Sequence, residues 1–289
     1  MKLFELPDSP NTRKVNFLVL KIMRDYPEWF VEDLEIEAVY GCPASCIWNG
    51  GCINYKQEGL LSREIIEIFD SYNKLGVSYR LTFTNRLLKA KHIDDFVGNT
   101  ILKCGHKDIN AVIVANDKIE KYVLSSFPKY NIIQSVCRVY ETEDDINTNS
   151  QNNLLCLPIR YNNDFEKLSK LKYPNNLMVL VNEFCPNSNC PFCKEHYETD
   201  NKYTLGLTSR SMDCVYMEEG KDIIKTGKVL EHHINQELYG LYEEIGINHF
   251  KINGRGRSAL RIVPEYAKYL VKEKYKDFFV EKILNEVGN

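Results

Sequence analysis

The chain has 289 residues, of which 44% are hydrophobic and 27% charged, and its formal net charge is -3 at pH 7. This composition is typical of a soluble globular protein, and the length is enough for one large domain or two small ones. The nearly balanced charge gives no electrostatic case for binding nucleic acid or an anionic membrane with the whole surface.

The amino-terminal segment has neither an apolar run of signal-peptide length nor a small-residue cleavage site, and no window approaches the length of a membrane-spanning helix. We therefore expect a cytoplasmic protein. Its ten cysteines would then stay reduced, and a chain of this length does not need disulfides to stabilise its core. Clustered cysteines in such a protein indicate a metal site or catalysis.

Short apolar runs alternate with longer segments of helical spacing along most of the chain. The apolar runs predict strands at residues 3–6, 36–40, 77–84, 111–115, 132–136, 154–159, 177–181 and 250–252. The other patterns predict helices at residues 11–30, 63–75, 92–103, from 117 onward, 164–171, 236–245 and 258–274. Residues 141–153 are predicted as a polar loop, and residues 195–231 carry mixed signals.

Strict alternation of strands and helices favours a parallel sheet. Eight strands in this length predict a single α/β domain over residues 1–289, a (β/α)₈ TIM-type barrel that is irregular in its last third. The alternative is an open doubly wound sheet. No Gly-x-Gly-x-x-Gly pattern follows the first strand, which disfavours the dinucleotide-binding form of that fold.

Two groups of cysteines follow predicted strands. Cys42 and Cys46 come after the strand at 36–40, and Cys185, Cys190 and Cys193 come after the strand at 177–181. Loops that follow the strands of a barrel open on one face, and strands two and seven lie on either side of strands eight and one. Five thiols on that face offer the four ligands that Zn²⁺ or a cubane iron–sulfur cluster takes. The alternative is a set of incidental loop thiols.

We favour a [4Fe–4S] cluster over Zn²⁺, because a structural zinc site usually brings two Cys-x-x-Cys pairs and only one is present here. Cys42 is the alternative to Cys46 as the ligand from the first group. His196 is a further candidate ligand, although an exposed loop histidine is the simpler interpretation. The predicted ligands are Cys46, Cys185, Cys190 and Cys193.

A barrel with a cysteine shortly after Val39-Tyr40 and three more after a later strand resembles the collagenase-like peptidase superfamily, nearest to its iron–sulfur members. These include the anaerobic ubiquinone-hydroxylation proteins and enzymes that hydroxylate bases in transfer and ribosomal RNA. The spacing from Val39-Tyr40 to Cys46 is similar to the segment that carries the first cluster cysteine in the quinone-pathway proteins. By this resemblance the later cysteines would supply the other three ligands.

The resemblance implies an iron–sulfur-dependent oxidoreductase that carries out oxygen-independent hydroxylation, or a related redox modification, of a small molecule or an RNA. A protein partner or a homo-oligomer is compatible with that function, and no membrane is involved. Peptidase activity is not supported, because no serine or cysteine nucleophile is paired with a base in the sequence. The competing function is a zinc-stabilised binding or accessory subunit without turnover.

Polar and aromatic residues near the strand ends complete the predicted site. Glu183 is a candidate general acid/base if burial raises its pKa, or else an ordinary strand-end carboxylate. Asn85, after the third strand, is a candidate donor to a substrate carbonyl or a helix cap. Trp48 is a candidate to stack on a planar ligand or to cover the cluster, and its alternative role is a packing anchor.

Arg255 and Arg257 lie in a glycine-bearing turn between the last strand and the next helix. Backbone N–H groups at a helix start and two guanidinium groups favour phosphate or carboxylate, and barrels commonly bind such anions at this position. We therefore predict that both arginines contact an anionic group of the substrate. The alternative is that they are solvated or pair with surface acids.

Overall fold

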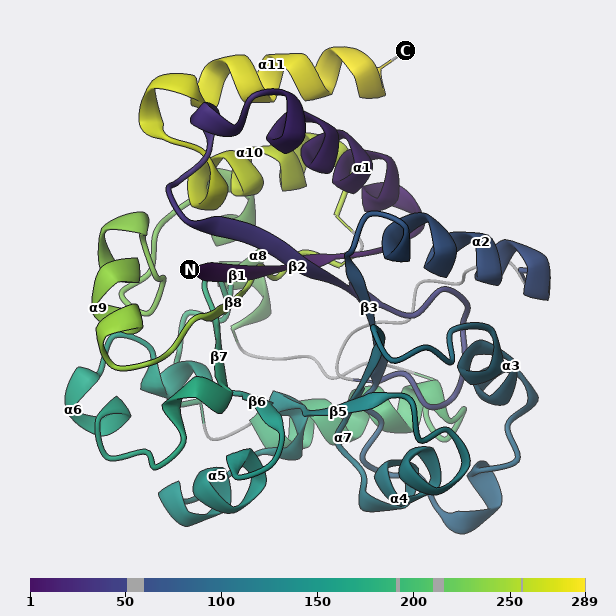
Figure 1. Ribbon diagram of the computed structural model, residues 1–289. Helices are drawn as coiled ribbons and strands as arrows, with labels where there is room; N and C mark the ends of the chain where they lie inside the picture. The colour runs from purple at the N-terminus through teal and green to yellow at the C-terminus, as the bar shows by residue number, and fades with distance from the viewer. Residues whose placement is uncertain (51–59, 191–192, 210–215, 256, 289) are drawn as a thin grey trace.

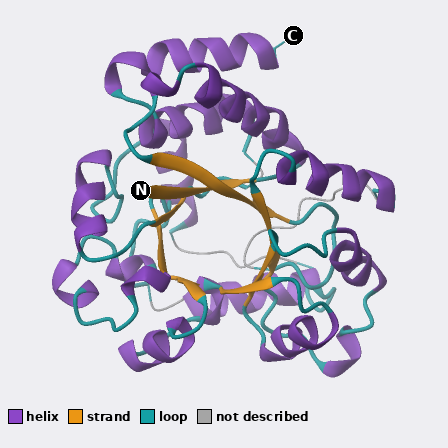
Figure 2. Cartoon of the chain, viewed as in Figure 1, coloured by secondary structure: helices purple, strands orange, loops and turns teal. Residues whose placement is uncertain are grey.

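The computed structural model describes residues 1–50, 60–190, 193–209, 216–255 and 257–288. Its eight strands are parallel and close into a barrel in the order β1-β2-β3-β4-β5-β6-β7-β8, with helices around the outside (Figure 1, Figure 2). This confirms the predicted (β/α)₈ TIM-type barrel. The strands are β1 (Lys2–Pro7), β2 (Leu34–Gly41), β3 (Ser78–Phe83), β4 (Ala111–Val114), β5 (Asn131–Gln134), β6 (Leu154–Cys156), β7 (Leu177–Leu180) and β8 (His249–Lys251).

Helices follow the strands along the chain and cover the outer face of the barrel (Figure 2). Within the described residues, no helix is both long enough and apolar enough to cross a membrane. The α-helices are α1 (Pro10–Asp25), α2 (Ser62–Asn73), α3 (Phe96–Cys104), α4 (Asp117–Ser126), α5 (Glu143–Ser150), α6 (Phe165–Leu168), α7 (Cys193–Thr204), α8 (Met217–Thr226), α9 (Tyr239–Glu244), α10 (Ala259–Leu270) and α11 (Lys276–Val287).

Some helix predictions were wrong for local reasons. α1 ends at Asp25 and not at residue 30, because Pro27 lacks the N–H that a continuing helix needs. Residues 141–153 contain α5 in place of the predicted loop. Thr142 accepts a hydrogen bond from the N–H of Asp145 at 3.1 Å, and Asp145 accepts one from the N–H of Thr142 at 3.0 Å, which is a capping box. A further helix, α11, follows the predicted last helix and was not predicted.

Alternation of side chains along the strands produces two buried layers. The larger layer lies between the strands and the helices, where residues such as Val39, Leu81 and Val179 are fully buried. The smaller layer fills the inside of the barrel and includes Ile113 and Met178. The barrel is therefore a packed core, and its functional groups have to lie at one of its ends.

Charged side chains also occupy the inside of the barrel. The Glu5 carboxylate is fully buried and pairs with both Arg80 and Lys251. Burial alone would raise the pKa of Glu5, but the two cations outweigh burial and lower the pKa from 4.5 to about 2. Arg80 also pairs with Glu37 at 2.7 Å, and the Lys251 ammonium lies 3.5 Å from the centre of the Tyr40 ring. These contacts link β1, β2, β3 and β8 beneath the carboxyl end of the barrel.

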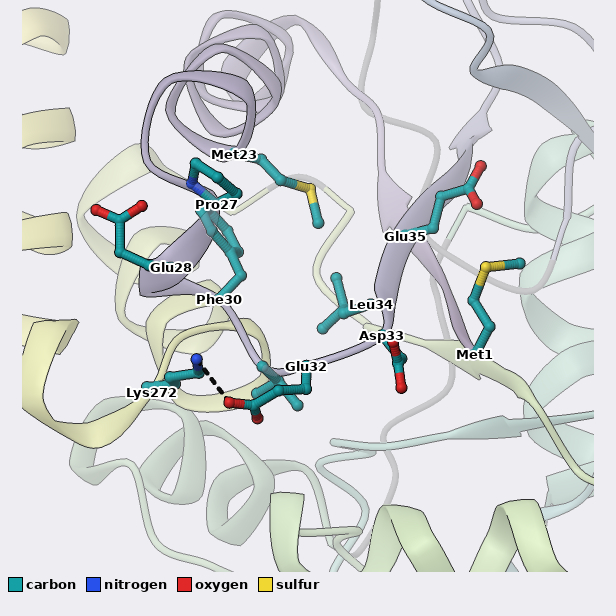
Figure 3. A pocket seen from close by; sticks show the side chains of 11 residues that line it. Met1, Met23, Pro27, Glu28, Phe30, Glu32, Asp33, Leu34, Glu35 and Lys272 are labelled. Atoms are coloured by element: carbon teal, nitrogen blue, oxygen red, sulfur yellow. Dashed lines mark ion pairs between the residues drawn. The ribbon is translucent and has the colours of Figure 1, made fainter.

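A surface pocket of about 510 Å³ lies where β1 and β2 begin (Figure 3). Its apolar lining includes Met23, Phe30 and Leu34, and an ion pair of 2.7 Å joins Glu32 to Lys272 at its edge. Barrel enzymes place their active sites at the carboxyl ends of the strands. This pocket therefore lies at the opposite end from the loops that carry the predicted site.

Candidate metal and substrate site at the barrel mouth

Two cysteine-bearing loops leave the carboxyl ends of parallel strands. Residues 42–50, here the first cysteine loop, follow β2, and residues 182–190, here the second cysteine loop, follow β7. The barrel order places β8 and β1 between β7 and β2. Both loops consequently lie at the same end of the barrel, here called the mouth, as the sequence predicts.

The first cysteine loop holds two thiols in contact. The sulfur atoms of Cys42 and Cys46 are 3.8 Å apart, and Cys42 donates to the carbonyl of Ala44 at 3.0 Å. Both cysteines are buried, and burial raises the pKa of the Cys46 thiol well above its ordinary value. A thiolate at this position would need a compensating positive charge, which is what a bound metal centre supplies.

The second cysteine loop is organised by short polar contacts. Glu183 accepts hydrogen bonds from the N–H groups of Phe184 at 2.8 Å and Cys185 at 3.4 Å. Asn187 accepts at its carbonyl from the thiol of Cys185 at 3.4 Å and from the N–H of Cys190 at 3.2 Å. Both cysteines are half-buried. The Asn187 carbonyl therefore orients the thiol of Cys185 and fixes the backbone of Cys190, which are two of the predicted ligands.

The structure describes the side chains of Cys46, Cys185 and Cys190 among the predicted ligands. Cys193 begins α7, but its side chain falls outside the described part of the structure, so its ligand role stays a prediction. Among the described side chains, no three His, Cys, Asp or Glu residues form a ready metal site. His196 lies on α7 and not in a loop. Its ring is 3.3 Å from Asp200, and that contact raises the pKa of His196.

Glu183 connects the second cysteine loop to its surroundings. One carboxylate oxygen accepts from the Asn253 side chain at 3.0 Å, and the Glu183 carbonyl accepts from His232 at 3.1 Å and His233 at 2.8 Å. Burial lowers the pKa of His233 to about 4, so this ring is neutral at neutral pH. These three partners of Glu183 were not predicted from the sequence, because no periodic pattern marks the two histidines and Asn253 is part of an ordinary turn.

Trp48 and Asn85 are both fully buried. The Trp48 indole donates to the carbonyl of His92 at 2.6 Å and packs edge-on against Phe83. Asn85 donates to the carbonyl of Ile47 at 2.9 Å. Both side chains thus hold the first cysteine loop in place. The contacts that these two side chains make are those of structural residues. Their contacts with a substrate stay predictions.

The two arginines point to different partners. Arg255 donates to the Thr82 hydroxyl at 2.9 Å and lies 3.5 Å from the side-chain oxygen of Asn49. Arg257 stacks on the Phe184 ring, with its guanidinium carbon 3.6 Å from the ring centre, and lies 4.0 Å from Glu265. Arg255 therefore reaches the first cysteine loop and Arg257 the second. Burial lowers the pKa of Arg257.

The segment between β8 and α10 consequently touches both cysteine loops. Asn253 contacts Glu183 in the second loop, and Arg255, two residues further on, contacts Asn49 in the first. Asn253 is further fixed by Asn182, which accepts from its N–H at 2.6 Å. Through this segment the protein holds two distant cysteine groups at one mouth.

No known family profile matches the chain, and no curated protein matches it in sequence. A solved structure, that of the U32 peptidase Mk0906, has a similar fold with a TM-score of 0.54 and 12% sequence identity. The similarity covers 89% of this chain and 94% of that one. At this identity the likeness shows the fold alone, which is the (β/α)₈ barrel described above, and the peptidase activity in its title is that protein's.

Proposed function

We propose that the chain is an iron–sulfur-dependent enzyme that carries out oxygen-independent hydroxylation, or a related redox modification, of a small organic molecule or an RNA. Its cluster ligands would be Cys46, Cys185, Cys190 and Cys193. The observation that carries the proposal is the pair of cysteine loops at one mouth, both contacted by the segment between β8 and α10. Donor sets made of thiols suit iron–sulfur clusters and zinc.

When bound, an iron–sulfur cluster supplies electron transfer beside the substrate. The remaining roles belong to side chains of the mouth. Glu183, in the second cysteine loop, is the proposed group that gives or takes a proton, and Asn253 orients its carboxylate. Arg255 is the proposed contact for an anionic group of the substrate, because Thr82 and Asn49 hold its guanidinium at the mouth.

Metal analysis of anaerobically purified protein tests this proposal. We expect about four iron and four sulfide ions per chain, with the broad visible absorption of a [4Fe–4S] cluster that bleaches in air. Purified protein that contains zinc in place of iron would support the second function below. Protein that binds neither metal after anaerobic reconstitution would contradict both functions.

The second function is a zinc-stabilised binding or accessory subunit without turnover. One observation favours it. Two thiolates on one tetrahedral zinc, with Zn–S bonds of about 2.3 Å, would lie about 3.8 Å apart. The sulfur atoms of Cys42 and Cys46 have that separation. In the zinc site Cys42 and Cys46 would both be ligands, whereas the cluster site takes one of them.

The anion contact gives a separate prediction. Arg255→Ala should weaken the binding of inorganic phosphate or sulfate about tenfold, because a charge-assisted hydrogen bond contributes roughly 1.5–3 kcal/mol. Isothermal titration of both anions against wild type and variant measures the change. Arg24→Ala is the matched control, since Arg24 is exposed on α1 and pairs with Asp25. Equal affinities in wild type and the Arg255 variant would remove Arg255 from the substrate site.

A further inference from the structure

Helix α7 continues the second cysteine loop and reaches the first. It begins at Cys193, and Asn201 in its last two turns is fully buried. The Asn201 carbonyl lies 3.5 Å from the side-chain nitrogen of Asn85, which follows β3. Within the described residues, neither side-chain amide atom of Asn201 has a hydrogen-bond partner. The contact of α7 with Asn85 therefore depends on the backbone of the helix and on close packing.

Asn85 is the residue that α7 and the first cysteine loop share. Its side-chain nitrogen donates to the carbonyl of Ile47 at 2.9 Å, and its N–H donates to the carbonyl of Trp48 at 3.0 Å. Its side-chain oxygen accepts from the N–H of Leu87 at 3.0 Å. One buried amide thus binds the residue directly after Cys46 and also faces α7.

Gly50 provides the space for this contact. A Cβ atom at Gly50 would lie 2.4 Å from the side-chain oxygen of Asn201 and 2.8 Å from the backbone nitrogen of Asn85. The carbonyl of Gly50 accepts a hydrogen bond from the Thr84 hydroxyl at 2.6 Å, which ties Gly50 to the residue directly after β3. Only glycine fits here, because α7 and the β3 end approach the loop too closely for a side chain.

We infer that Gly50 and Asn85 form a docking contact that sets the position of α7, and with it the second cysteine loop, against the first cysteine loop. They are positioning residues for the metal centre, a role that rests on the proposed function. A metal centre whose ligands come from two separate loops binds more tightly when both loops already hold their bound positions. Less conformational entropy is then lost on binding. The docking contact holds the two cysteine loops in these positions independently of the segment between β8 and α10.

Hydrogen exchange of the metal-free protein tests the docking contact directly. Asn85→Ala and Gly50→Ala should each make the amides of α7 exchange about tenfold faster or more, since each removes buried hydrogen bonds or forces the elements apart. The matched control is Asn110→Ala, a fully buried asparagine that bonds to Tyr79 and Gly105 away from both cysteine loops. That variant should lower overall stability without a selective change in α7. Asn85→Ser replaces Asn85→Ala if the alanine variant does not fold.

A second measurement follows metal release to a chelator from the loaded protein. We expect release at least about tenfold faster from the Asn85 and Gly50 variants than from wild type or the Asn110 variant. Unchanged exchange in α7 would overturn the docking contact even if wild type holds metal. Wild-type protein that binds no metal would contradict the proposed function and the positioning role, while faster α7 exchange in the variants would still establish the docking contact between α7 and the first cysteine loop.

Discussion

Alanine at any one predicted cluster ligand should reduce bound iron to less than about a tenth of the wild-type content. Each thiolate would supply one of the four protein bonds that hold the centre, so the loss of one leaves the site with three ligands. Iron and sulfide analysis after anaerobic reconstitution measures the effect. The variants are Cys46→Ala, Cys185→Ala, Cys190→Ala and Cys193→Ala.

Two buried cysteines outside the first and second cysteine loops provide the controls. Cys137 and Cys156 are buried, and burial raises the pKa of Cys156 to about 12, so it behaves as a small hydrophobic residue. Their alanine variants should keep full metal content. If all four ligand variants keep their metal, the assignment fails. If Cys46→Ala is silent and Cys42→Ala is not, Cys42 replaces Cys46 as the ligand.

Glu5→Gln should lower the free energy of unfolding by about 3–5 kcal/mol, because it leaves Arg80 and Lys251 buried without their shared counter-charge. Urea denaturation followed by circular dichroism measures the change. Glu273→Gln is the control, since Glu273 pairs with Lys276 at the surface and its loss should have no measurable effect. A Glu5 variant as stable as wild type would show that this buried network contributes little to stability.

The same carboxylate should make stability depend on pH in acid. The pKa of Glu5 is lowered from 4.5 to about 2 in the folded protein, so the unfolded chain binds the proton more tightly. The stabilisation is complete above pH 4.5 and is lost as pH falls from 4.5 through about 2. Denaturation curves in this range should show a loss of roughly 3 kcal/mol in wild type that is absent from Glu5→Gln.

The architecture could be predicted from local patterns. Eight apolar runs separated by helical spacing indicate a closed parallel barrel, and that inference needs only the periodicity of neighbouring residues. The position of Cys42, Cys46 and Cys185 directly after strands then places them at one mouth, because all loops that follow strands of a barrel open on the same end. Helix α5, which Thr142 and Asp145 cap, could not be predicted in this way. A short polar helix lacks the apolar periodicity on which helix prediction depends.

Only the closed barrel decides which side chains meet across it. Glu5, Arg80 and Lys251 are far apart in the chain, and each looks like an exposed charge in a short strand, yet closure brings them together inside the barrel. Asn85 and Gly50 likewise look like ordinary loop residues until α7 packs against them. A sequence determines its strands, helices and caps through neighbours a few residues apart. Burial and pairing between distant residues arise only when the strands close, and the candidate site is built from such pairs.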